Sequence, residues 1–176
     1  MIKGIDIASR EQETFQKVAS GTYRYYGDKK TEDKEGEISH VSTYYEDHAN
    51  AGISALDFMK KCRLQELMDR DNSSAINEFM IGDQPVWLDK ATRSGLDLRL
   101  KAEKAKSKTT TTLWYNGIQF TLDIDIAISM LLAIEVYASE CYDNTQRIAA
   151  AIEEMDSAED VFTFDITQGY PDKLKF

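Results

Sequence analysis

The chain has 176 residues, of which 30% are charged and 42% are hydrophobic. A chain of this length ordinarily buries one core, and this composition is typical of a folded soluble protein, which excludes a wholly disordered or a membrane-embedded chain. The 21 basic and 31 acidic side chains give a net charge of −10, so the chain repels nucleic-acid phosphates unless its cations gather in one patch.

Two features bear on the cellular compartment. Residues 1–6 lack the apolar run of a secretory signal, and the longest apolar stretch, Ile124 to Ala138, is shorter than the roughly 20 residues that span a bilayer. Cys62 and Cys141 lie far apart on helix-like apolar patterns, which predicts buried free thiols, with a disulfide as the alternative. We therefore expect a protein that is made in a cytoplasm.

The N-terminal segment, residues 1–51, is predicted to form a helix followed by an arm. Ser9 and Gln12 fit a capping box, which predicts a short helix from Arg10 to about Ala19. The charged run 28–37 has no apolar face, which is typical of a long loop. Flanking tyrosines can anchor such an arm on a neighbouring subunit, and a local hairpin is the alternative. The tyrosines concerned are Tyr23, Tyr25, Tyr26, Tyr44 and Tyr45.

Residues 52–176 are predicted to form an α+β core domain. A capping box that begins at Ser54 and an apolar stripe predict a helix as far as Arg70. Two short strands, 76–81 and 84–88, flank a tight turn, and Pro85 places the second strand at an edge. Asp89 can then cap a helix that runs to about Lys106. The stripe consists of Leu56, Met59, Leu64, Leu67 and Met68.

The second half of this domain begins with a clear hairpin signal. Asn116-Gly117 lies between two apolar triplets, which predicts a type I′ hairpin over 109–123. Apolar residues recur at helical spacing from Ile124 and predict a long helix that ends near Met155, and a capping box at Ser157 predicts a short helix after it. The apolar tail 170–176 is expected to dock. The predicted fold class is α+β, with two short β-hairpins packed on a long C-terminal helix and two further helices, and with an extended N-terminal arm.

Charge is unevenly distributed along the chain. Residues 90–108 hold seven cations and two anions, a balance of +5, whereas residues 140–165 hold eight anions and one cation, a balance of −7. The opposite charges of these two segments favour head-to-tail packing of copies of the chain. For residues 90–108, the alternatives are a surface that binds nucleic acid and a cationic face that is exposed to solvent and contacts no partner. Besides the five tyrosines, the predicted interface residues are Arg93, Arg99, Lys101, Lys104, Glu153, Glu154, Asp160, Tyr170 and Phe176.

The sequence lacks the common motifs whose residue spacing positions catalytic groups. It contains no glycine-rich phosphate loop, no G-x-S-x-G elbow, no H-E-x-x-H helix and no paired CxxC, so we expect no catalysis and no cofactor. Glu135 lies among apolar residues and is either a buried acid or a surface group that faces solvent or pairs with an arginine. Asp123 and Asp125 are placed to cap the long helix. His40 and His48 suggest a metal site with Glu46 and Asp47, and ordinary surface histidines are the alternative.

Four motifs carry a family resemblance. The segments 85–90 (PVWLDK), 113–120 (LWYNGIQF), 137–145 (YASECYDNT) and 170–174 (YPDKL) resemble small proteins of unknown function encoded in phages and prophages of Bacteroides-like bacteria. They are also similar to a phage tail-associated domain of unknown function. The resemblance covers about residues 76–176 and implies a role in the virion or its assembly, in a tail, neck or fibre attachment. It carries over no catalytic residue.

We therefore expect an oligomeric phage virion structural or assembly protein that contacts other virion proteins, is made in the host bacterial cytoplasm and binds no membrane. The alternative, suggested by the acidic segment 140–165, is an inhibitor that mimics nucleic acid and blocks a host defence protein. An enzyme centred on Glu135 is a third hypothesis.

Overall fold

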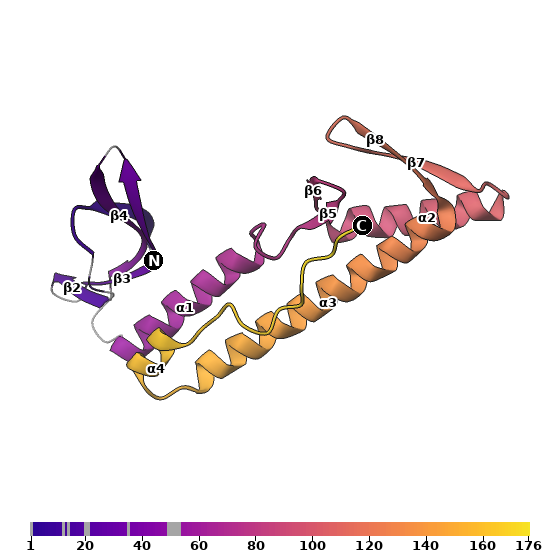
Figure 1. Cartoon of the computed structure of the whole chain (residues 1–176). Coiled ribbons are helices and arrows are strands. Elements are labelled where there is room, and N and C mark those ends of the chain that lie inside the picture. The colour runs from indigo at the N-terminus through magenta and orange to yellow at the C-terminus, as the bar shows by residue number, and fades with distance from the viewer. Residues whose placement is uncertain (1, 12, 14, 20–21, 35, 49–53) are drawn as a thin grey trace. The chain divides into compact units, whose positions relative to one another are not determined.

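A computed structural model describes residues 2–11, 13, 15–19, 22–34, 36–48 and 54–176. The chain divides into two compact units, unit 1 with residues 1–69 and 148–166 and unit 2 with residues 70–147 and 167–176. Each unit is therefore assembled from segments that are distant in the sequence (Figure 1). The sequence predicts a domain boundary between residues 51 and 52. That boundary separates segments expected to fold independently, which a division into compact units does not test, so it stays a prediction.

Unit 1 contains a four-stranded antiparallel sheet in the order β1-β4-β3-β2. The strands are β1 (Ile2–Ala8), β2 (Phe15–Ala19), β3 (Thr22–Lys34) and β4 (Glu37–His48). The prediction of a helix from Arg10 to Ala19 is wrong, because residues 15–19 pair with β3. The capping pattern is a local signal, and pairing with the next strand, β3, satisfies the same backbone groups. Gln12, the second half of that pattern, lies outside the described residues.

The tyrosine-rich segment is the hairpin β3–β4, so the local-hairpin alternative is confirmed. Tyr25 pairs with Tyr45 and Tyr26 with Tyr44, and the ring centroids lie 6.1 Å and 6.2 Å apart. The charged run forms the outer part of the hairpin, where residues 30–34 pair with residues 37–41. The side chains in this part of the hairpin are mostly exposed. Backbone hydrogen bonds between the two strands therefore hold it together, and it forms without an apolar face to bury.

Helix α1 (Ala55–Asp71) packs one side against this sheet. The Ser54 hydroxyl accepts from the Asp57 backbone N–H at 3.0 Å, which confirms the predicted cap. The predicted apolar stripe is correct at Met59 and Leu67 but wrong at Met68, whose residue surface is 57% exposed. The buried side of α1 is formed by Phe58, Met59, Cys62, Arg63, Glu66 and Leu67.

Unit 1 is completed by the end of the long helix and by the short helix α4 (Ala158–Thr163). The Ser157 hydroxyl accepts from the Asp160 backbone N–H at 3.3 Å, as the capping box predicts. Phe162 meets the edge of Tyr25, with ring centroids 6.5 Å apart. Helix α4 therefore packs on Tyr25 of the sheet.

Unit 2 begins with the hairpin β5 (Phe79–Ile81) and β6 (Gln84–Val86), as predicted. The C-terminal residues dock beside β5, where the Met80 N–H donates to the Leu174 carbonyl at 2.9 Å and the Phe176 N–H donates to the Met80 carbonyl at 2.8 Å. Strand β5 is thus flanked on both sides. Strand β6, which contains Pro85, is left at the edge as expected.

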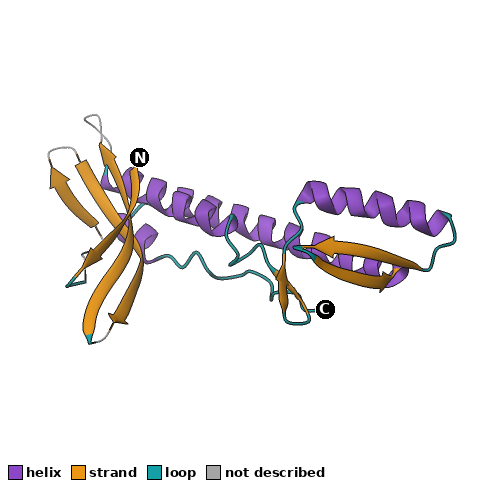
Figure 2. Ribbon diagram, turned by 90° about the horizontal axis from the view of Figure 1, so that it is seen from above, coloured by secondary structure: helices purple, strands orange, loops and turns teal. Residues whose placement is uncertain are grey.

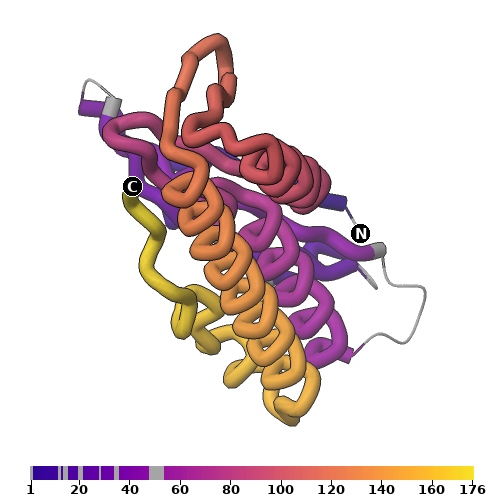
Figure 3. The backbone as a smooth tube through the Cα atoms, turned by 90° about the vertical axis from the view of Figure 1, so that its right-hand side faces the viewer, coloured from indigo at the N-terminus to yellow at the C-terminus, as the bar shows by residue number. Residues whose placement is uncertain are grey.

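Unit 2 is completed by helix α2 (Lys90–Ala105), by the hairpin of β7 (Thr110–Tyr115) and β8 (Ile118–Asp123), and by helix α3 (Ile124–Glu154) as far as residue 147 (Figure 2). Asn116 and Gly117 have φ angles of 47° and 80°, which a type I′ turn requires. Leu100 of α2 packs against Ala127 and Leu131, so α2 and the first half of α3 run alongside each other (Figure 3).

The chain is mixed α+β with two short hairpins and a long C-terminal helix, which confirms the predicted fold class. The ends of the long helix agree with the prediction to within one residue. Within the described ranges, no helix is both long and apolar enough to cross a membrane.

Candidate functional site

An apolar cleft of about 470 Å³ lies in unit 2 between α2, α3 and the two hairpins. Its volume is in the range of protein sites that bind ligands or partner side chains. Residues on all of these elements contribute to its lining, among them Phe79, Trp87, Leu96, Leu113, Leu122 and Met130.

The local folding of each element explains why these side chains converge. On the hairpin, Leu113 and Phe120 are directly paired, so they share a face. On α2, Leu96 and Leu100 are four residues apart and lie on one side of the helix. On α3, the buried residues nearest the cleft are Ala127, Leu131 and Ile134.

The polar side chains at the cleft are engaged in holding the fold. Asp89 accepts from the Thr92 backbone N–H at 2.8 Å, and this hydrogen bond holds the pKa of the carboxyl below its usual value. Arg99 donates to the Thr112 carbonyl at 2.8 Å and so joins α2 to β7. The lining is otherwise almost entirely apolar, so the cleft is suited to recognising apolar groups by burial.

Exposed apolar side chains also occur on the elements that surround the cleft. Trp114 lines the cleft and is nevertheless 67% exposed, and Leu98 on α2 is 71% exposed. On α3, Leu132 and Val136 are 61% and 58% exposed and lie four residues apart. Exposed tryptophan is characteristic of protein-binding surfaces.

A second, more polar cavity of about 400 Å³ contains Glu135. Arg93 pairs with Glu135 at 2.6 Å and also donates to the Leu88 carbonyl at 2.7 Å. The Glu135 side chain is 50% exposed, which confirms the prediction that it pairs with an arginine at the surface. Glu135 is therefore not the buried acid on which the enzyme hypothesis depended.

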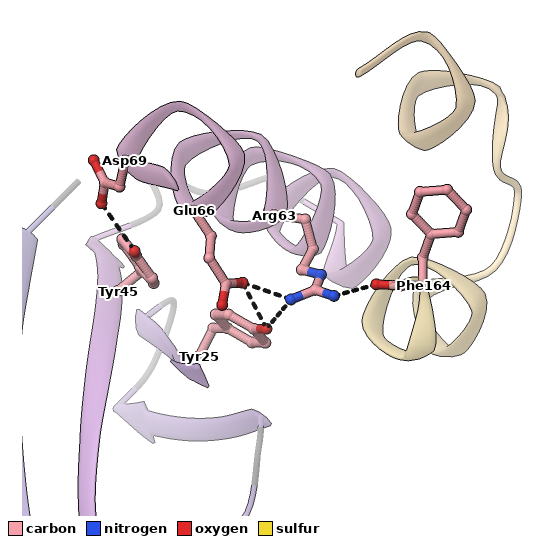
Figure 4. A network of polar contacts seen from close by, with 6 residues as sticks. All are labelled: Tyr25, Tyr45, Arg63, Glu66, Asp69 and Phe164. Atoms are coloured by element: carbon pink, nitrogen blue, oxygen red, sulfur yellow. Dashed lines mark hydrogen bonds and ion pairs between the residues drawn. The ribbon is translucent and has the colours of Figure 1, made fainter. Parts of the chain in front are cut away.

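A buried polar network holds the sheet of unit 1 to α1 (Figure 4). Arg63 donates to the Glu66 carboxylate at 2.6 Å and to the Tyr25 hydroxyl at 3.1 Å, and it also contacts the Phe164 carbonyl. Burial, together with the Glu66 charge, raises the pKa of Tyr25 above its ordinary range. Sequence patterns did not indicate this network, because a charged pair three residues apart on a helix usually lies in solvent.

The predicted interface tyrosines are only partly accessible. Tyr25, Tyr26 and Tyr45 are at most 3% exposed and pack within their own unit, while Tyr23 and Tyr44 are half-buried. Tyr170 is half-buried, shares a hydrogen bond with Thr145 and packs against the buried cluster of Ile76, Tyr137 and Cys141, as docking of the tail predicts. Phe176 is 38% exposed and meets the Phe79 ring edge-on at 5.8 Å.

The predicted charged interface residues are separated into two groups. Arg93, Arg99, Lys101 and Lys104 lie on α2 in unit 2, and each forms an ion pair with a nearby carboxylate. Glu153, Glu154 and Asp160 lie exposed in unit 1, and no ion pair involves them among the described residues. Whether these residues contact a partner stays a prediction.

The histidines and cysteines show ordinary structural environments. His40 lies on β4 near the Thr31 hydroxyl, and the side chain of His48 lies outside the described residues. Considering only the residues that the structure describes, no group of three or more metal-binding side chains is assembled. Both cysteines are buried free thiols, as predicted, and burial raises the pKa of Cys62 to about 12.

Asp123 has the capping role that the sequence predicts. Its carboxylate accepts from the Asp125 backbone N–H at 2.8 Å at the start of α3. Asp125 itself pairs with Lys104.

Comparisons with protein families, with curated proteins and with solved structures found no match for this chain.

Proposed function

We propose that this chain is a structural or assembly protein of a phage virion, without catalytic activity, and that it binds other virion proteins through the apolar cleft of unit 2. The observation that carries the binding role is the cleft itself, an apolar hollow whose lining includes Trp114, a residue that is 67% exposed. An apolar side chain of a partner would be buried there, which is the usual way in which a few residues supply most of the binding energy of an interface.

The virion part of the proposal is supported by the family resemblance. Two of the four motifs that carry it, 85–90 and 113–120, contribute side chains to the cleft. The residues include Trp87 and Leu88 from the first motif and Leu113, Trp114 and Phe120 from the second. The surface that is best suited to a partner is thus built in part from two of the segments that resemble phage tail-associated proteins.

The proposal is tested by recovering the protein in purified particles. Trp114→Ala should weaken cleft binding by about 2 kcal/mol, or roughly 30-fold, because it removes an exposed anchor without opening the core. Tyr142→Ala is the matched control, since Tyr142 is 59% exposed in the same unit but does not line the cleft. Mass spectrometry of virions should find the wild type and the control, with the Trp114 variant depleted. Absence of the wild type from particles would refute the virion role.

The acidic segment favours one alternative function, an inhibitor that mimics nucleic acid. Glu153, Glu154, Asp156, Glu159 and Asp160 are all exposed in unit 1, and no ion pair neutralises them within the described ranges. A row of unpaired carboxylates can imitate phosphates to a cationic DNA-binding site. A nuclease that is captured from host lysate and released by duplex DNA would support this alternative. Capture that survives added DNA would count against it.

A further inference from the structure

Strand β1 is an open edge of the sheet in unit 1. It is the outermost strand in the order β1-β4-β3-β2 and pairs on one side with β4. On its other side, an edge strand presents backbone N–H and C=O groups that can pair with a further strand. Among the residues that the structure describes, no strand pairs with that side of β1. Another strand can therefore be added there.

The two edges of this sheet differ in how they are protected. Edge strands are commonly protected by short length, bulges, proline or charged side chains. Strand β2, at one edge, has five residues and an irregular register between Lys17 and Ala19. Strand β1 has seven residues, contains no proline and pairs regularly from Ile2 to Ala8. Its one lysine, Lys3, is held in an ion pair with Asp69 of α1. The β1 edge is the less protected of the two.

Strand β1 also exposes apolar side chains. Ile5 and Ile7 are 71% and 68% exposed. Because they are two residues apart, both point to the same face of the sheet, next to Thr43 and Val41 of β4. A regular edge strand with exposed isoleucines is favourable for pairing with another apolar strand.

We propose that β1 pairs in antiparallel orientation with β1 of a second copy of this chain, with Ile5 opposite Ile5 on a two-fold axis. Ile7 of each copy then lies opposite the aliphatic stem of the other Lys3, so the isoleucines of both copies form one apolar patch. Gly4 lies opposite Asp6 and Ile2 opposite Ala8, so no like charges face each other.

Other registers of β1 against itself are less favourable. With Ile5 opposite Ile7, Asp6 faces Asp6, and like charges directly opposite are destabilising. With Gly4 opposite Gly4, Ile2 faces the Asp6 carboxylate. A shift by one residue places the isoleucines of the two copies on opposite faces of the joined sheet. Among registers that pair at least five residues of β1 with one another, the strand is thus self-complementary in a single one, which favours a second copy over an unrelated strand as the partner.

This pairing rests on the proposed assembly function, which it deepens by naming a second copy as a partner. It uses unit 1, whereas the proposed virion contacts use the cleft of unit 2. The two proposals can therefore fail separately. A β1 dimer of a chain that is absent from virions would refute only the virion role, and a monomeric chain found in virions would refute only the pairing.

The first experiment is light scattering of the full chain over a range of concentrations. The wild type should approach twice the chain mass of 20.0 kDa as concentration rises, and Ile5→Lys should stay at once that mass, because two ammonium groups would meet at the axis. Ile38→Lys is the matched control, since Ile38 is 59% exposed on β4 and should leave the dimer intact. A wild type that is monomeric at every concentration overturns the proposal.

The second experiment fixes the register and does not depend on a loss of association. Ile5→Cys should form a disulfide between copies under mild oxidation, because directly opposite residues bring their Cβ atoms close enough. Ile2→Cys is the control, since the two copies of residue 2 would lie about 20 Å apart. The native thiols are buried and should not compete. Equal cross-linking at positions 2 and 5 would overturn the proposed register.

Discussion

Arg63 and Glu66 place opposite charges in the interior of unit 1. Each side chain is 10% exposed, and their carboxylate–guanidinium contact is 2.6 Å. A charge that is removed from water is tolerated only where partners replace its hydration. The Tyr25 hydroxyl and the Phe164 carbonyl supply those further partners, so one network connects the sheet, α1 and the segment after α4.

Glu66→Gln should therefore destabilise the protein strongly. The substitution keeps the size of the side chain but leaves the Arg63 charge buried without its counter-charge, which costs about 3–5 kcal/mol. Urea unfolding followed by circular dichroism measures the change. Lys101→Ala breaks an exposed pair with Asp97 and should change the free energy of unfolding by less than about 1 kcal/mol. Equal effects of the two substitutions would contradict a buried role for the network.

At the scale of single elements, the structure requires glycine at one position but not at another. Gly117 occupies the turn between β7 and β8 with a φ of +80°, a conformation that L side chains rarely adopt. Gly95 lies inside α2, where an added Cβ would meet nothing within 4 Å. The same substitution should thus have opposite signs at the two sites.

Gly117→Ala should lower the free energy of unfolding by about 1 kcal/mol, because it forces an alanine into the left-handed region. Gly95→Ala should raise it by about 0.5–1 kcal/mol, because alanine restricts the unfolded chain and favours the helix. Thermal or urea denaturation of the two variants beside the wild type measures both signs. A stabilised Gly117 variant would show that the hairpin does not require the type I′ turn.

At the scale of the whole molecule, charge is balanced through contacts that a sequence window does not include. The local balance of +5 over residues 90–108 suggests a cationic face. In the structure, Lys104 pairs with Asp125 and Arg93 pairs with Glu135, and both carboxylates belong to α3. Much of that positive charge is therefore compensated within unit 2. Head-to-tail attraction between copies remains a prediction. Fewer unpaired cations on α2 are available for it than the sequence suggests.

Buried acids in both units predict a loss of stability at alkaline pH. Burial raises the pKa of Cys62 to about 12 and raises the pKa values of Tyr25 and Tyr137 above their ordinary range. These groups stay protonated in the folded chain but ionise in the unfolded chain from about pH 8.5 for cysteine and about pH 10 for tyrosine. The unfolded state then binds fewer protons, so stability falls as pH rises.

The contribution of these three groups to the free energy of unfolding should be nearly constant from pH 7 to about 8.5. Above that pH, each group that ionises in the unfolded chain should lower the free energy of unfolding by up to about 1.4 kcal/mol per pH unit. Urea titrations at a series of pH values measure the slope. Cys62→Ala should reduce the slope between about pH 9 and 10, where cysteine is the first of the three to ionise. An unchanged slope in that variant would contradict the shift at Cys62.

Local signals in the sequence determined the helix caps and turns of this protein. Ser54, Asp89 and Ser157 each accept from a backbone N–H three residues ahead, and Asn116-Gly117 needs only its own backbone to set the turn. The long helix was equally predictable, because its apolar residues repeat over eight turns. All of these features are decided by residues a few positions apart.

The tertiary structure decided what depends on distant partners. Glu135 became a surface ion pair because Arg93, which lies 42 residues away in the sequence, contacts it in the folded chain. Even residues 15–19 required pairing with β3 to become a strand, although β3 begins only three residues later. The cleft could not be predicted either, since the sequence shows which side chains are apolar but only packing leaves a hollow between them. Hydrogen bonds within one turn are encoded locally, whereas burial and charge pairing depend on which surfaces meet after the chain has folded.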